Sequence, residues 1–69
     1  MTSLEKIVLR TVRFCKDYPE LTESDQSVRT LVYDDMLSTF GPRMTTGQMV
    51  GELTDSVLFH LGRKKVVVN

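Results

Sequence analysis

Apolar residues recur at intervals of three and four in three separate stretches of this chain, and proline or glycine separates the stretches. Such intervals place side chains on one face of an α-helix, whereas a half-buried strand requires an interval of two. The three apolar stripes are Leu4, Ile7, Val8, Val12, Cys15 and Tyr18; Val28, Leu31, Val32, Met36, Leu37 and Phe40; and Met49, Val50, Leu53, Val57, Leu58 and Leu61. The pattern predicts an all-α chain with three helices.

The first two helices have clear start and stop signals. Thr2 and Glu5 have the spacing of a capping box, and Pro19 disfavours a helical backbone at the residue before it, so the first helix is expected at about residues 3–17. The second is expected at about residues 25–40. The hydroxyl side chain of Thr22 or Ser24 is expected to cap its beginning. Gly41 and Pro42 mark its end.

The third helix is expected at about residues 46–61. Thr45 and Gln48 form a second capping-box spacing before it. Gly51 lowers helix stability, and Thr54-Asp55-Ser56 are residue types that favour helix caps over helix interiors. One long helix and two shorter helices therefore both remain open.

The size of the chain limits how the helices can be stabilised. With 69 residues, of which 41% are hydrophobic, it builds one small core. Cys15 is the single cysteine, so it cannot close an internal disulfide, and together with His60 it supplies too few ligands for a structural zinc site. We predict a small three-helix bundle, with residues 1–62 as a single helical domain and no metal or cofactor.

Residues 63–69 form a basic, Val-rich C-terminal tail. The β-branched residues Val66–Val68 favour an extended backbone, so a short strand and a disordered tail are both compatible with the sequence. No apolar run approaches the length of about 18 residues that spans a membrane, and no signal pattern occurs at Met1 to Ile7. We expect a cytoplasmic protein with no membrane partner. A homodimer is an alternative to a monomer, because so small a core gains from further burial.

Charges are segregated along the chain although its formal net charge is zero. Residues 1–16 contain four basic residues and one acidic residue, and residues 17–35 contain six acidic residues and one basic residue. Lys6, Arg10 and Arg13 are spaced by four and three, which aligns them along the first helix. This basic line predicts contact with an acidic protein surface, contact with nucleic-acid phosphates, or a solvated face opposite the protein's own acidic segment.

Methionines lie close to the turn between the second and third helices. Met44 and Met49 flank the start of the third helix. Methionine is frequent on adaptable binding surfaces and is also a common core filler. The predicted partner-binding residues are therefore Lys6, Arg10, Arg13, Met44 and Met49.

A carboxylate, a hydroxyl and an imidazole follow one another at intervals of four in the third helix. These are Glu52, Ser56 and His60. One helix surface provides neither an oxyanion hole nor a water-excluding cleft, and catalytic triads draw their members from separate elements. We interpret this stripe as a polar face and predict no enzymatic activity.

A second interpretation of the third segment rests on a small residue at Gly47, an apolar residue and glycine at Val50-Gly51, and an aliphatic residue at Val57. Through these positions, residues 43–60 resemble the helix-turn-helix of DNA-binding regulators. Three positions that are normally apolar in that family depart from its pattern: Thr46, Glu52 and His60. The resemblance implies nucleic-acid contacts from Thr54, Ser56, Arg63, Lys64 and Lys65.

Neutral net charge favours a protein partner over nucleic acid, which usually binds a strongly basic domain. The leading prediction is a small non-enzymatic interaction or regulatory protein that docks on a larger protein or assembly. Its size suits a viral or mobile-element modulator of a host machine. The alternative is a helix-turn-helix-like DNA-binding transcriptional regulator.

Overall fold

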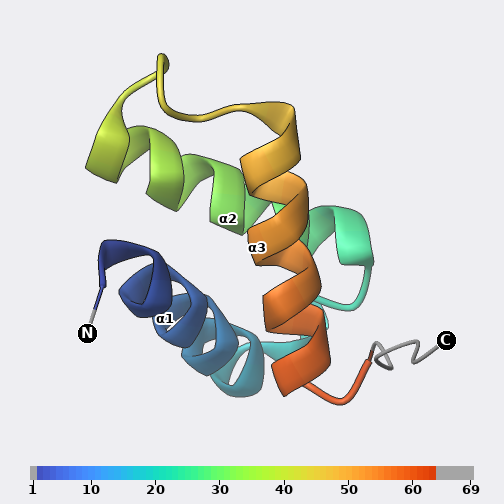
Figure 1. The fold of residues 1–69 in the computed structure, drawn as a ribbon. Helices are drawn as coiled ribbons and strands as arrows, with labels where there is room; N and C mark the ends of the chain where they lie inside the picture. Colours follow the sequence, from blue (N-terminus) through green and yellow to red (C-terminus); the bar gives the residue numbers. More distant parts are fainter. Residues whose placement is uncertain (1, 64–69) are drawn as a thin grey trace, which may run out of the picture.

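The computed structural model describes residues 2–63 and folds them into three α-helices. The helices are α1 (Ser3–Asp17), α2 (Asp25–Phe40) and α3 (Gly47–His60), and a short 3-10 turn, η1 (Pro19–Leu21), lies between α1 and α2 (Figure 1). The predicted all-α three-helix bundle is confirmed, and the observed bounds differ from the expected ones only at the two ends of α3. The tail residues Lys64, Lys65 and Val66–Val68 lie outside the described residues.

Each helix packs against the other two. Figure 1 shows α3 running across α2 and down toward the C-terminal end of α1. Among residues 2–63, no helix has both the length and the apolar character that crossing a membrane requires.

Hydroxyl side chains cap all three helices. The side chains of Thr2, Ser24 and Thr46 accept hydrogen bonds from the backbone N–H groups of the third residue of each helix. The expected cap at Thr45 is wrong by one residue. Its hydroxyl instead donates to the carbonyl of Gly41 at 2.8 Å, so it stabilises the connection between α2 and α3.

The third helix is continuous through its weak helix formers. Thr54 is 5% exposed, and its hydroxyl donates to the carbonyl of Val50 at 2.7 Å, so this buried polar group is satisfied within the helix. The alternative of two shorter helices is therefore wrong. The turn that the helix-turn-helix resemblance requires at Val50-Gly51 is also absent, because both residues lie inside α3.

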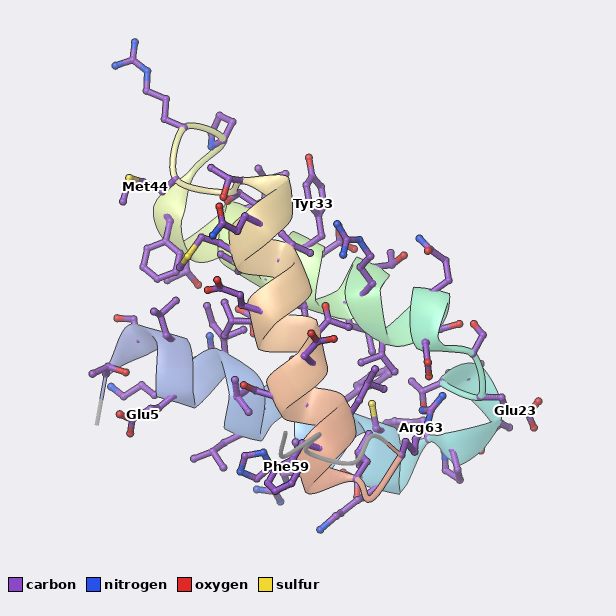
Figure 2. The ribbon with its side chains drawn as sticks, turned by 45° about the vertical axis from the view of Figure 1, so that its right-hand side comes forward. Glu5, Glu23, Tyr33, Met44, Phe59 and Arg63 are labelled. Atoms are coloured by element: carbon purple, nitrogen blue, oxygen red, sulfur yellow. The ribbon has the colours of Figure 1, made fainter. Side chains whose placement is uncertain are left out.

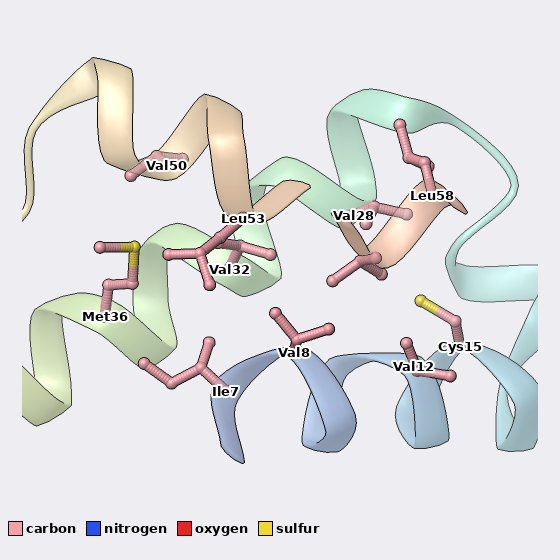
Figure 3. Close-up of a cluster of buried hydrophobic side chains, with 11 residues drawn as sticks. Ile7, Val8, Val12, Cys15, Val28, Val32, Met36, Val50, Leu53 and Leu58 are labelled. Atoms are coloured by element: carbon pink, nitrogen blue, oxygen red, sulfur yellow. The ribbon is translucent and has the colours of Figure 1, made fainter. Parts of the chain in front are cut away.

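The core lies where the three apolar stripes meet (Figure 3). Its buried side chains are Ile7, Val8, Val12, Cys15, Val28, Val32, Met36, Val50, Leu53, Val57 and Leu58. Cys15 is a free thiol and is 5% exposed, as expected for a small apolar side chain. α2 contributes only three fully buried residues, so its apolar face is narrower than its sequence stripe suggested.

Candidate functional site

A groove lies between α1 and α3, with a volume of about 420 Å³. Five apolar side chains and four polar ones line it. They are Leu4, Val8, Leu9, Met49 and Leu53, together with Glu5, Glu52, Ser56 and His60. Its apolar lining and polar margin are typical of binding surfaces.

The groove follows from the way α1 presents two adjacent apolar residues. Val8 belongs to the core and is 8% exposed, whereas Leu9 is turned by about 100° around the helix and is 46% exposed. On the facing helix, Leu53 is buried and Met49 packs partly against the core. The core packing of α1 against α3 therefore leaves Leu9 as an exposed side chain of one wall.

The charged residues of the groove are both acidic, and they come from opposite walls. Glu5 belongs to α1 and Glu52 to α3, and no lysine or arginine lines the groove. Glu52 accepts a hydrogen bond from the side-chain amide of Gln48 at 3.4 Å. Within the part of the chain that the structure describes, neither carboxylate forms an ion pair. The groove thus combines an apolar lining with uncompensated negative charge.

The polar stripe of α3 contributes the remaining groove residues. His60 Nδ1 donates to the backbone carbonyl of Ser56 at 2.7 Å, so this bond is not made to the Ser56 hydroxyl. The imidazole also contacts the ring of Phe59 edge-on, with ring centroids 5.9 Å apart. This arrangement orients His60 without forming a base–nucleophile pair.

The basic line is divided by an ion pair. Arg10 donates from Nε and Nη2 to the two carboxylate oxygens of Asp35 in α2, at 3.0 and 2.8 Å. The hydrogen bond and then the charge of Asp35 raise the pKa of the Arg10 guanidinium above its ordinary value. Lys6 and Arg13 are exposed. Arg10 is therefore paired with the protein's own acidic segment, and of the basic line only Lys6 and Arg13 remain available to a partner.

The two methionines predicted to bind a partner lie in different surroundings. Met44 is 64% exposed in the connection between α2 and α3, and Figure 2 shows it far from Phe59 and Arg63 at the other end of α3. Met49 lines the groove, and Met44 does not. They do not form a single patch.

The residues suggested for nucleic-acid contact are also separated. Thr54 is buried in the core, Ser56 lies in the groove, and Lys64 and Lys65 are outside residues 2–63. Arg63 donates to the carbonyls of Thr22 and Glu23 and to the carboxylate of Asp25; its side chain lies near η1 in Figure 2. Thr54 and Arg63 are thus occupied by contacts within the protein.

Sequence reasoning missed Leu4, Glu5 and Leu9 as site residues. A usable signal was present for Leu9, which is a large apolar residue outside the stripe of its helix. No group of three or more metal-ligating side chains occurs among residues 2–63. Comparison with known proteins gives no family model, no curated protein and no solved structure that matches this chain.

Proposed function

We propose that this chain is a small, non-enzymatic interaction protein that docks on a larger protein and modulates it. The groove between α1 and α3 is the observation that carries the proposal. An apolar hollow with a polar margin is the kind of surface that excludes water from a protein contact. Leu9 leaves 46% of its surface in solvent at this groove, so covering it with a partner would bury apolar area that the bundle itself does not cover.

We do not extend the proposal to DNA binding. Reading bases in a groove of DNA requires exposed donors and acceptors on the inserted helix, with basic groups on the phosphates. Thr54 is a buried residue of α3, and Arg63, which follows α3, is bound to the segment before α2. The segment that resembles a helix-turn-helix also lacks the turn.

The test is capture from a native lysate by the tagged protein and two matched variants. Leu9→Asp places a charge in the groove, and Leu21→Asp places the same charge on η1, at a side chain that is 61% exposed and outside the groove. Both positions are exposed, so both variants should keep the helical circular dichroism of the wild type. We expect a stoichiometric protein to be retained by Leu21→Asp and reduced about tenfold by Leu9→Asp, the effect of losing roughly 1.4 kcal/mol of binding energy.

The same experiment separates the groove from the basic line. The double variant Lys6→Ala, Arg13→Ala removes exposed positive charge and leaves the Arg10–Asp35 pair intact. Retention of the partner by this variant is expected. Loss of the partner here but not with Leu9→Asp would refute the groove as the docking site, and recovery of nucleic acid in place of protein would refute the proposed function.

A further inference from the structure

We propose that the occupant of the groove is a basic amphipathic α-helix of the partner protein, with an apolar stripe flanked on both sides by lysine or arginine. This inference rests on the proposed function, because it identifies the partner surface for the same groove. The shape of the groove, its length and its charge each narrow the choice of ligand.

The make-up of the groove disfavours the other common modes of peptide binding. Addition of a β-strand requires an exposed sheet edge, and residues 2–63 form no strand. Proline-rich segments dock against aromatic side chains, and phosphorylated segments dock on arginine clusters. The residues that line this groove include no Phe, Tyr, Trp or Arg. An amphipathic helix that lays its apolar face into a hydrophobic groove is the mode that this apolar lining between two helices fits.

The length of the groove fits such a helix. Its residues on α3 extend from Met49 to His60, which corresponds to about 16 Å at a rise of 1.5 Å per residue. A docking helix that uses anchors at positions i, i+3 or i+4, and i+7 spans about 10 Å. On α3, the side chains of Met49, Leu53 and Ser56 repeat at the same spacing. Two full turns of a partner helix therefore fit along the wall.

The charge of the groove selects the flanks of that helix. Glu5 on α1 and Glu52 on α3 stand on opposite walls, and no lysine or arginine lines the groove. A helix seated between these walls presents one flank to each carboxylate. Lysine or arginine on both flanks is favourable there, whereas acidic flanks are repelled. The partner helix is therefore basic on both sides of its apolar stripe.

The test uses three synthetic helical peptides and the full chain labelled with ¹⁵N. The first peptide carries leucines at i, i+4 and i+7 with lysine flanks; the second replaces every lysine with glutamate; the third has the first composition in an order that destroys the stripe. We expect the first peptide to bind about tenfold more tightly than either of the others. Its amide shift changes should centre on groove residues such as Leu9 and Met49.

Charge variants supply the matched control. The double variant Glu5→Gln, Glu52→Gln should weaken binding of the lysine peptide about fivefold or more. The double variant Glu20→Gln, Glu23→Gln removes the same charge from exposed positions outside the groove and should leave the affinity unchanged. Circular dichroism of both variants checks that they fold.

The outcomes distinguish this inference from the proposed function. Equal binding of the lysine and glutamate peptides, equal binding of the scrambled peptide, equal effects of the two charge variants, or shift changes away from the groove would each overturn the basic helix. If Leu9→Asp still reduces capture of a protein about tenfold in that case, the docking function stands with a different occupant. If capture is also insensitive to Leu9→Asp, both proposals fail.

Discussion

The ion pair between Arg10 and Asp35 removes one of the three residues of the basic line from the surface available to a partner. The guanidinium contacts both carboxylate oxygens, which is the geometry in which arginine cannot be replaced by lysine. We expect Arg10→Lys and Arg10→Ala to lower the melting temperature measurably, and Lys6→Ala and Arg13→Ala to leave it unchanged. Thermal unfolding followed by circular dichroism measures all four.

Salt and pH sharpen this prediction. The ion pair is exposed, so 1 M NaCl should screen it and narrow the difference between Arg10→Ala and the wild type. Because the pKa of Arg10 is raised, the guanidinium stays charged throughout the neutral pH range, and its charge is lost only as pH rises through the higher, folded-state value. The difference should therefore be constant between about pH 6 and pH 9. A difference that persists unchanged in salt would contradict the ion pair as its cause.

At the scale of single elements, α3 shows why a helix can run through residues that weaken it. Gly51 lies in the middle of α3, and a Cβ placed there would be 3.5 Å from Nη1 of Arg29, an ordinary van der Waals contact. Gly51→Ala should therefore raise the free energy of unfolding by about 0.5–1 kcal/mol, because alanine loses less backbone entropy in a helix. Urea unfolding measures the change.

A second glycine provides the control for Gly51. Gly41 ends α2 with φ +82° and ψ 173°, a conformation that is open to glycine and strained for other residues. Gly41→Ala should lower the free energy of unfolding by about 1 kcal/mol or more. Destabilisation by both alanine variants would contradict the expectation for Gly51 and indicate that the Arg29 side chain needs the space that a Cβ at Gly51 would occupy.

The bounds of the helices were predictable because periodicity, caps and breakers act within a few residues of one another. Thr45 and Thr46 show the limit of this local information, since adjacent threonines compete for one cap and the path of the connection selects the second. The groove could not be predicted, because it depends on how α1 packs against α3. A basic line facing the protein's own acidic segment was one of the expected arrangements, but the selection of Arg10 and Asp35, which lie 25 positions apart, depends on how α1 packs against α2.

At the scale of the whole molecule, a small core makes single long-range links important. A domain of this length is expected to have a stability of about 3–10 kcal/mol. Arg63 links the end of α3 to the segment before α2 and to the first residue of α2, across 38 to 41 positions of sequence. Its three hydrogen bonds close the bundle at the end opposite the connection between α2 and α3.

Loss of this link should therefore lower the stability of the whole domain. Arg63→Ala is expected to lower the free energy of unfolding by about 1–3 kcal/mol, because it removes bonds to two backbone carbonyls and one carboxylate. The free energy of unfolding of Arg63→Lys should lie between those of Arg63→Ala and the wild type, since an ammonium group cannot reproduce the planar fork of the guanidinium. Urea unfolding in low salt and in 1 M NaCl distinguishes this link from the Arg10 pair. Two of the three groups that accept hydrogen bonds from Arg63 are uncharged carbonyls, so most of the effect of Arg63→Ala should persist in high salt. An effect that disappears in salt would instead assign the link to the Asp25 carboxylate alone.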